Sequence, residues 1–217
     1  MKLNDMNSIE ALNWRYATKK FDAETLLPES KIDTLKHAFR LTATSYGLQP
    51  MKLLVIQDKN AQQKIQTLCM NQQQIGTASH LLILCTVQNI NEDFIEKYFT
   101  KVKQIRNTPD KIIQPFQDFL TEDFKEKTKQ EIETWAVNQV YLAMGNLLTV
   151  CAQEKIDACP MEGFQQLEIN RFLELEKLGL SAALLLPVGI RAADDIFADF
   201  KKVRKPLEEI VIDWKNQ

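Results

Sequence analysis

The stretch that decides the fold covers residues 131–163 and reads EIETWAVNQVYLAMGNLLTVCAQEKIDACPMEG. Its apolar side chains recur at the i, i+3, i+4 and i+7 spacing of one helix face, at Val137, Val140, Tyr141, Met144, Leu147, Leu148 and Cys151. Further apolar residues, Ala136, Leu142, Ala143 and Val150, fall on the other faces. Because a helix that is apolar nearly all round is a buried one, we expect this helix to form the centre of the core.

Gly145 and Pro160 shape the same stretch. A glycine weakens a helix interior by about 1 kcal/mol relative to alanine, so we expect another helix to approach closely at Gly145. Pro160 cannot continue a helix, so the chain must turn there and present the backbone of Met161, Glu162 and Gly163. We interpret this turn as part of an active site. From these residues alone, a core helix followed by an ordinary turn remains the alternative.

Residues 135–152 carry no charge and reach the roughly 17 residues that a membrane span requires. Polar residues interrupt this run at Asn138, Gln139, Asn146 and Thr149. No polybasic flank follows, which favours a buried helix of a soluble protein. The N-terminal residues, MKLNDMN, lack the apolar core of a signal peptide, so we expect a cytoplasmic protein.

The composition predicts one domain over residues 1–217 and excludes several classes of protein. A net charge of -2 and a pI near 5.8 give no global field that favours nucleic acid or an anionic membrane. The four cysteines, Cys69, Cys85, Cys151 and Cys159, form no C-x-x-C pair and are expected to be reduced structural thiols. With His37 and His80 as the only histidines, a multi-histidine metal centre within one chain is excluded.

The six glycines form neither G-x-G-x-x-G nor a P-loop. If a nucleotide-like cofactor binds, side chains must therefore hold its phosphate. Two basic groups could do so, Arg15 with Lys19 and Lys20 near the start of the chain, and Lys202 with Arg204 and Lys205 near its end. Charge runs are usually solvated faces, and that alternative stays open for each group.

Short apolar runs predict strands at residues 52–57, 81–87, 182–190 and 210–214. Helices are expected at Ser8–Trp14, 28–41, 61–70 and 165–172, and a loop at 71–77. Residues 91–130 mix charges with aromatic side chains, and Pro109 and Pro115 break the run, which predicts two amphipathic helices as an excursion over the core. Strands separated by helices, one of them too apolar for a monomer, predict a layered α/β sandwich that dimerises through helices.

No nucleophile stands beside a base in this pattern, so a hydrolase has little support. His80, between Ser79 and an apolar run, is expected to be structural. Neutral donors occur as the hydroxyls of Thr44 and Ser45 and the amides of Asn71 and Gln74. Neutral and basic donors without a titrating centre suit a cofactor that carries its own chemistry.

Six motifs occur in order along the chain: RYATKKFD (15–22), TSYGLQP (44–50), NQQQIGTASH (71–80), NQVYLAMGNLL (138–148), PMEGF (160–164) and KKVRKP (201–206). Together they resemble the FMN-dependent nitroreductase family, most closely its oxygen-insensitive NAD(P)H nitroreductase and dihydropteridine reductase branch, over about residues 8–206. The resemblance implies an α+β fold, a three-layer α/β/α sandwich with a central mixed sheet, and an intertwined homodimer that binds two FMN molecules at the subunit interface.

The resemblance also implies the FMN contacts, with no metal. Arg15, Lys202 and Arg204 would grip the phosphate, and Tyr16 and Ala17 would contact the same cofactor. Lys19 would reach the pyrimidine side of the ring, where a cation stabilises reduced flavin, and Asn71 would contact the ring. The partner subunit would donate the loop with Ala43, Thr44, Ser45 and Gly47. Backbone N–H groups of the turn Pro160, Met161, Glu162 and Gly163 would face flavin N5 and O4. We assign catalytic roles to Lys19 and Glu162.

The sequence departs from the family pattern at three positions. Gln74 replaces a lysine near the pyrimidine end, Gly47 replaces an asparagine of the partner loop, and Met51 replaces an aromatic residue. The region 91–130 does not match residue by residue.

The implied activity is ping-pong two-electron transfer, in which NADH or NADPH delivers hydride to N5 and leaves before a nitroaromatic, quinone, pterin or similar acceptor enters. The alternatives are a specialised member, such as a dehalogenase or a flavin-consuming enzyme, and a flavin-binding or scaffold dimer without turnover. No nucleic-acid or membrane partner is expected.

Overall fold

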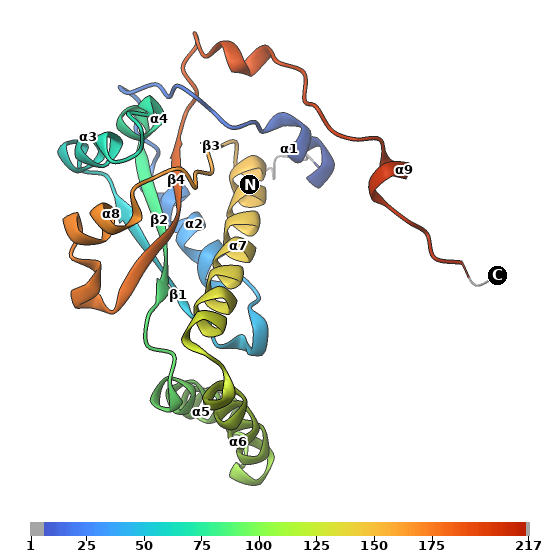
Figure 1. Ribbon diagram of the computed structural model, residues 1–217. Helices are drawn as coiled ribbons and strands as arrows, with labels where there is room; N and C mark the ends of the chain where they lie inside the picture. The colour runs from blue at the N-terminus through green and yellow to red at the C-terminus, as the bar shows by residue number, and fades with distance from the viewer. Residues whose placement is uncertain (1–6, 216–217) are drawn as a thin grey trace.

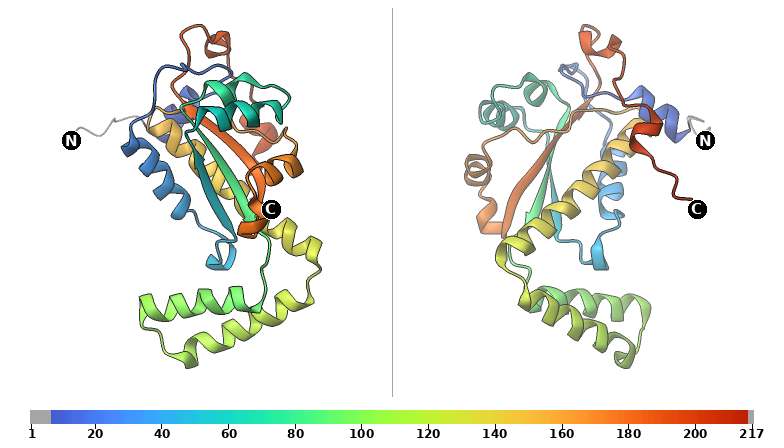
Figure 2. Two further views of the ribbon diagram at one scale, coloured as in Figure 1. Left: turned by 90° about the vertical axis from the view of Figure 1, so that its left-hand side faces the viewer. Right: turned by 45° about the vertical axis from the view of Figure 1, so that its right-hand side comes forward.

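The computed structural model describes residues 7–215, which fold around a four-stranded sheet with helices on both of its faces (Figures 1 and 2). Most of the N-terminal stretch used to judge the absence of a signal peptide, residues 1–6, lies outside the described residues. The elements in chain order are α1 Ser8–Trp14, α2 Glu29–Arg40, η1 Ser45–Gly47, β1 Met51–Ile56, α3 Lys59–Thr67, α4 Gln73–Thr77, β2 His80–Val87, α5 Glu92–Arg106, α6 Asp110–Glu126, α7 Lys129–Gln153, β3 Asp157–Ala158, α8 Gln166–Phe172, η2 Leu175–Leu178, β4 Leu180–Gly189, η3 Ile196–Asp199 and α9 Leu207–Ile210, where η marks a 3₁₀ helix.

The sheet has the order β1-β2-β4-β3, and its neighbouring strands pair antiparallel. Side chains of β2 alternate between two buried faces, with Leu82 and Leu84 on one and Leu81 and Ile83 on the other. Helices cover both faces, so the expected three-layer α/β/α sandwich is confirmed. Among residues 7–215, the parallel component of the expected mixed sheet is limited to an isolated bridge between Ala17 and Ala158.

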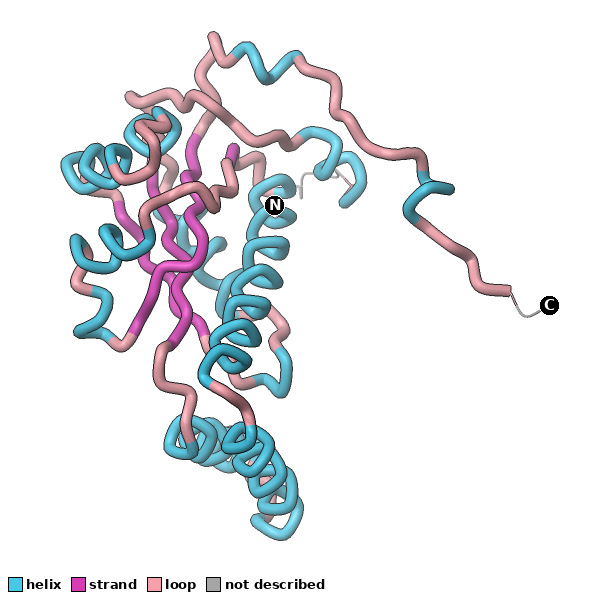
Figure 3. The backbone as a smooth tube through the Cα atoms, in the orientation of Figure 1, coloured by secondary structure: helices cyan, strands magenta, loops and turns pink. Residues whose placement is uncertain are grey.

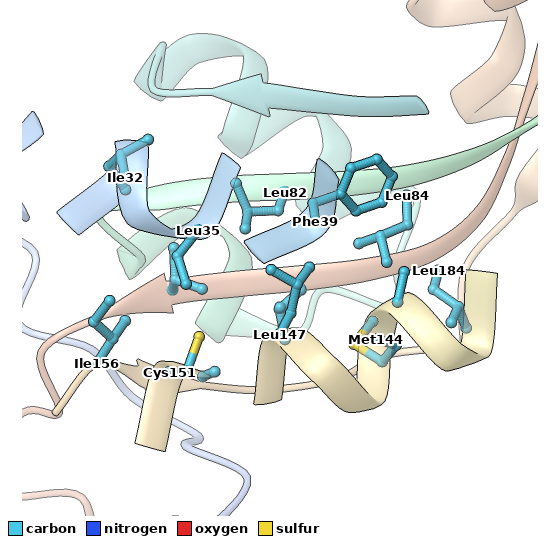
Figure 4. Packing of buried hydrophobic residues seen from close by; sticks show 14 of the residues in the cluster. Ile32, Leu35, Phe39, Leu82, Leu84, Met144, Leu147, Cys151, Ile156 and Leu184 are labelled. Atoms are coloured by element: carbon cyan, nitrogen blue, oxygen red, sulfur yellow. The ribbon is translucent and has the colours of Figure 1, made fainter. Parts of the chain in front are cut away.

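The larger core lies between the sheet and the helix pair α2 and α7 (Figure 4). Leu35 of α2 and Leu147 of α7 are fully buried against Leu82 of β2. Each such side chain contributes roughly 1.5–3 kcal/mol by leaving water. On the opposite face, α3, α4 and α8 pack through Ile65, Ile75 and Ile169.

Helix α7 is the long helix that the sequence predicted. It begins with a capping box in which the Thr128 hydroxyl accepts the N–H of Glu131 at 3.2 Å and the Glu131 carboxylate accepts the N–H of Thr128 at 2.7 Å. Its last residue is Gln153, so β3 intervenes before Pro160. The expected close approach at Gly145 is absent within this chain, since among residues 7–215 no atom outside its chain neighbours and the backbone of its own helix lies within 4 Å of a Cβ placed there.

Helices α5 and α6 form an antiparallel pair below the sheet in Figure 1, as expected for 91–130. Their own small core includes Ile95, Phe99, Leu120 and Phe124. Pro115 does not break the run but lies inside α6, which loses one backbone hydrogen bond there and continues.

Two local predictions were wrong. The loop expected at 71–77 contains α4, and the strand expected at 210–214 is absent. Residues 201–215 instead form an arm that leaves the body of the protein, with α9 as its only helix (Figure 3). A strand needs a neighbour to satisfy its backbone, and the arm has none beside it; Ile212, for example, is 88% exposed.

Candidate functional site

Residues 15–19 and residues 197–204, far apart in the sequence, meet at a basic cleft of about 300 Å³. One wall is the segment after α1, and the other is the segment that runs from η3 into the arm. The lining residues are Arg15, Tyr16, Ala17, Lys19, Phe197, Phe200, Lys201, Lys202 and Arg204. The predicted phosphate-binding residues Arg15, Lys202 and Arg204 therefore lie together.

The cations of this cleft repel one another. Burial, followed by the charge of Arg204, lowers the pKa of Arg15, and burial, followed by the charges of Arg15 and Arg204, lowers the pKa of Lys202. The ammonium of Lys202 donates to the backbone carbonyl of Arg15, and Arg204 donates to the carbonyl of Val203 at 2.6 Å. Within the described part of the chain, no carboxylate forms an ion pair with any of the three. A bound phosphate would relieve this repulsion, so the residues present fit an anionic group.

Lys19 lies at the inner end of the cleft, against the sheet. The bridge between Ala17 and Ala158 and a hydrogen bond from the Thr18 N–H to the Ala158 carbonyl at 3.2 Å fix its segment beside β3. The Lys19 ammonium and the Gln74 amide each lie 3.9 Å from the sulfur of the buried Cys159. The sheet thus brings the predicted residues Lys19 and Gln74 together, directly before Pro160.

The turn after Cys159 presents fewer amides than expected. Met161 is buried, and its N–H donates to the Leu185 carbonyl at 2.9 Å in an isolated bridge. Pro160 has no N–H. Among residues 7–215, the N–H groups of Glu162 and Gly163 have no backbone acceptor, so these two remain as donors for a ligand. The N–H of Met161, which was expected to face the cofactor, is therefore already paired within this chain.

The Glu162 side chain has a partner that the sequence did not suggest. The Tyr141 hydroxyl of α7 faces this carboxylate, and their interaction is the main reason why the pKa of Tyr141 is raised. The contact ties the turn to the long helix. Glu162 and Tyr141 are both exposed in this chain, so the carboxylate is accessible to solvent.

The predicted residue Asn71 lies in a segment that packs against the same turn. Met70 and Asn71 both have a φ of 53°, a left-handed conformation that is unusual for residues other than glycine. The Gln72 amide donates to the Gly163 carbonyl at 3.4 Å, and the Met70 methyl lies 2.6 Å from where a Cβ of Gly163 would be. A larger residue at position 163 would therefore displace the exposed Met70 side chain.

The predicted loop residues Ala43, Thr44, Ser45 and Gly47 do not join the cleft of their own chain. They follow the C-terminal end of α2 and lie at the end of the sheet that faces α5 and α6 (Figure 2). Helix α1 and η3, which border the cleft, lie at the far end of the sheet. The Ser45 N–H donates to the Gln139 side chain at 2.8 Å. Gly47 has a φ of +75°, and the Tyr98 hydroxyl lies 2.6 Å from the position that its Cβ would take.

Three residues that contact the predicted site residues were not predicted from the sequence. Tyr141 faces Glu162, Cys159 lies beside Lys19, and Asp195 accepts the Tyr16 hydroxyl.

The described part of the chain contains no cluster of three or more potential metal-ligating His, Cys, Asp or Glu side chains. All four cysteines are buried free thiols, as expected. None of the helices within residues 7–215 has the length and apolar character to span a bilayer.

Comparison with known proteins gives consistent matches. The family described as "Nitroreductase family" matches residues 12–190. "Putative NAD(P)H nitroreductase YfkO" of Bacillus subtilis (strain 168) is 31% identical over 218 residues, covering 94% of this chain and 95% of that protein.

Two solved structures share the fold. A nitroreductase-like protein from Streptococcus mutans has a TM-score of 0.82 at 23% identity, covering 95% of this chain and 98% of its own. A "putative nitroreductase in complex with FMN" from Exiguobacterium sibiricum has a TM-score of 0.82 at 20% identity, covering 96% of this chain and 97% of its own.

Proposed function

Because the chain belongs to the nitroreductase family, we propose that it is an FMN-dependent NAD(P)H oxidoreductase that reduces nitroaromatics, quinones or related acceptors by ping-pong two-electron transfer. The observation that carries this proposal is the meeting of Arg15 with Lys202 and Arg204 at one cleft, where none of the three forms an ion pair with a carboxylate of residues 7–215. The FMN complex of a structural neighbour supports the choice of cofactor.

The chain would hold FMN at two places. Arg15, Lys202 and Arg204 would bind its phosphate with charge-assisted hydrogen bonds, each worth about 1.5–3 kcal/mol. At the other end, Lys19, Gln74 and Asn71 and the N–H groups of Glu162 and Gly163 would surround the ring system. When bound, FMN would supply the chemistry of accepting a hydride from NADH or NADPH and passing two electrons to an acceptor.

Lys19 would be the main electrostatic group of the reaction. Among the described residues its ammonium has no carboxylate partner and rests near the Cys159 sulfur, so its charge is available to stabilise a developing anion. The Glu162 and Gly163 amides would add fixed N–H dipoles, which need no reorganisation during the reaction. Because position 74 is a glutamine and not a lysine, Lys19 would supply the positive charge near the ring system without a second cation from position 74.

We further propose that the enzyme is a homodimer. The face of α7 that carries Tyr141, Leu142 and Gly145 is exposed in this chain, and Leu142 alone is 54% exposed. Such a face on the most apolar helix suits a second copy. The partner would also bring the loop at 43–47 to the cleft, which this chain's own loop does not reach.

The arm and a groove at the edge strand β1 fit one another between two copies. The groove has a volume of about 600 Å³ and combines the apolar Phe39, Met51, Leu53 and Val55 with the basic Lys36, Arg40 and Lys52. The arm is complementary, with apolar Leu207, Ile210 and Ile212 and acidic Glu208, Glu209 and Asp213. We propose that the arm of one subunit binds the groove of the other. Because the face of α7 would remain, a chain ending before Leu207 should still dimerise but more weakly than the full chain, as measured by sedimentation at a series of protein concentrations. Equal dimerisation of the two chains would contradict a role for the arm.

A cytoplasmic location is proposed as well, because all four cysteines are free and disulfides persist mainly in oxidising compartments.

The decisive experiment combines colour and turnover. The purified protein should be yellow, release FMN on denaturation, and oxidise NADH or NADPH when a quinone or nitroaromatic is added. A yellow protein without turnover would support a non-catalytic flavin-binding dimer instead. A protein that neither retains nor binds added FMN would reject the proposed function.

A further inference from the structure

Asp195 is a buried carboxylate at the junction of the two cleft walls, and it is 5% exposed. One of its oxygens, Oδ2, accepts the Tyr16 hydroxyl at 2.8 Å, the Lys19 N–H at 2.9 Å and the Lys20 N–H at 3.3 Å. The other oxygen accepts the N–H of Phe197 at 3.2 Å and so caps η3. A single side chain thus collects donors from both walls.

These bonds fix the positions of the basic residues. Tyr16 and Lys19 belong to the same short segment as Arg15, while η3 is followed by Lys202 and Arg204. The Lys202 bond to the Arg15 carbonyl and a bond from the Ala192 N–H to the Lys20 carbonyl at 3.0 Å join the same two segments. Asp195 is the one acidic side chain among these contacts.

We infer that Asp195 is a positioning residue for anion binding, which holds the wall of Arg15 and Lys19 against the wall of Lys202 and Arg204 so that their cations converge on one phosphate. The inference rests on the proposed binding of FMN for the identity of that phosphate. It goes further by assigning a role to a residue that itself touches no ligand.

The ionisation of the network agrees with this geometry. Burial alone would raise the pKa of Asp195, but the hydrogen bonds from Lys19, Tyr16, Phe197 and Lys20 hold it below its ordinary value. Burial and the bond to Asp195 raise the pKa of Tyr16, so its hydroxyl stays protonated and donates. The carboxylate is therefore charged and fully used as an acceptor near neutral pH.

A positioning role and a simple charge effect predict opposite changes in the affinity for FMN when Asp195 is replaced by asparagine. A negative charge near a phosphate site weakens anion binding, so by charge alone Asp195→Asn should bind FMN more tightly. If Asp195 positions the walls, the same change should bind FMN more weakly. In asparagine one oxygen becomes an NH₂ group, which would face either the Phe197 N–H or the three donors around Oδ2.

Asp194 provides a matched control, because it is the adjacent acid in the same loop. Its carboxylate is exposed and pairs with the Lys20 ammonium at 2.5 Å. Asp194→Asn removes the same charge and weakens only this exposed contact with Lys20, while the four hydrogen bonds to Asp195 stay in place. Tyr16→Phe removes one donor to Asp195 and leaves the net charge unchanged.

The test is a titration of each flavin-free dimer with FMN, followed by the quenching of flavin fluorescence, and a parallel titration with inorganic phosphate. Asp195→Asn should raise the Kd for both probes about tenfold or more and Tyr16→Phe should raise it several-fold, consistent with the loss of one to three hydrogen bonds. Asp194→Asn should leave the Kd unchanged or lower it. Circular dichroism before each titration establishes that the variant is folded, so the Kd reports the site rather than overall stability.

Each outcome decides the inference. An Asp195→Asn protein that binds FMN and phosphate as tightly as the wild type, or more tightly, would overturn it. If that variant does not fold, Tyr16→Phe decides in its place, and an unchanged Kd would again overturn it. A wild type that binds phosphate but not FMN would reject the proposed function while leaving the role of Asp195 testable with phosphate. A wild type that binds neither would reject both.

Discussion

Asp157 and Arg191 form a nearly enclosed ion pair at the end of the sheet, where the Arg191 Nε lies 2.7 Å from the Asp157 Oδ1 and the Arg191 N–H donates to Oδ2 at 2.8 Å. The Asp157 side chain is 4% exposed. The guanidinium also lies over the rings of Trp14 and Tyr16, with its central carbon 4.5 and 4.6 Å from the ring centroids. The pair thus joins β3 and the end of β4 to the segment that carries Arg15.

Removal of one partner of this pair should destabilise the protein strongly. Asp157→Asn leaves a largely buried guanidinium without its counter-charge, so we expect a loss of about 3–5 kcal/mol in the free energy of unfolding, measured by urea denaturation. Glu168→Gln breaks the exposed pair with Arg171 and should cost less than about 1 kcal/mol. Equal losses in the two variants would contradict the assigned importance of the buried pair.

Charge reversal in the basic cleft should remove the flavin without unfolding the protein. Lys202→Glu combined with Arg204→Glu deletes two cations and adds two repulsive charges, so the Kd for FMN should rise about 100-fold or more and the purified protein should be colourless. Lys205→Glu, on the same arm but outside the cleft lining, should retain FMN. Full flavin content in the double variant would count against these residues as phosphate ligands.

Substitution of Lys19 should slow flavin reduction while FMN stays bound. Lys19→Met removes the cation but keeps a side chain of similar length, and we expect the rate of reduction by NADH in stopped-flow measurements to fall about tenfold or more. The matched control is Lys20→Met, which loses only an exposed pair with Asp194. Identical traces for the wild type and Lys19→Met would refute the electrostatic role.

His80 should make stability depend on pH. This residue is buried, and its ring lies 2.8 Å from the Ser79 hydroxyl. Burial lowers the pKa of His80; the charge of Glu29 opposes this shift, and the charges of Lys59 and Lys36 add to it. The unfolded chain therefore takes up a proton at a higher pH than the folded protein does. Stability from this residue is complete above about pH 6.5 and is lost as the pH falls through the range between the unfolded and folded values.

The measurement is the free energy of unfolding by urea between pH 7.5 and pH 5. His80→Gln should flatten its decline, whereas His37→Gln, at an exposed position of α2, should leave the slope as in the wild type. An unchanged slope in His80→Gln would show that other groups cause the decline.

Much of the fold was predictable because it depends on periodicity. The apolar helix α7, the three main strands and the helix pair at 91–130 all carry patterns that extend over several turns or residues. The errors occurred where a neighbour decides the outcome. Short α4 depends on packing of Ile75 into the core, and the arm at 201–215 has no strand beside it within this chain.

The site was predictable only in part. Arg15, Lys202 and Arg204 were placed together through the order of the family motifs, and their proximity cannot be obtained from spacing alone. Asp195 was missed because its partner Tyr16 is 179 positions away, and Tyr141 was missed because it looked like one more apolar residue of α7. Met161 was expected to offer its amide, but pairing with Leu185 depends on the fold of the sheet.

The contact between Gly47 and Tyr98 links two positions that we expect to change together. The phenol of α5 fills the space that any larger residue at position 47 would need, and the backbone there already favours glycine. The asparagine that the family resemblance implies at this position would therefore have to displace the Tyr98 ring or be accompanied by a smaller residue at 98. Homologous chains should show this exchange of volume as correlated substitution, with glycine accompanying tyrosine and bulkier residues accompanying a shortened side chain.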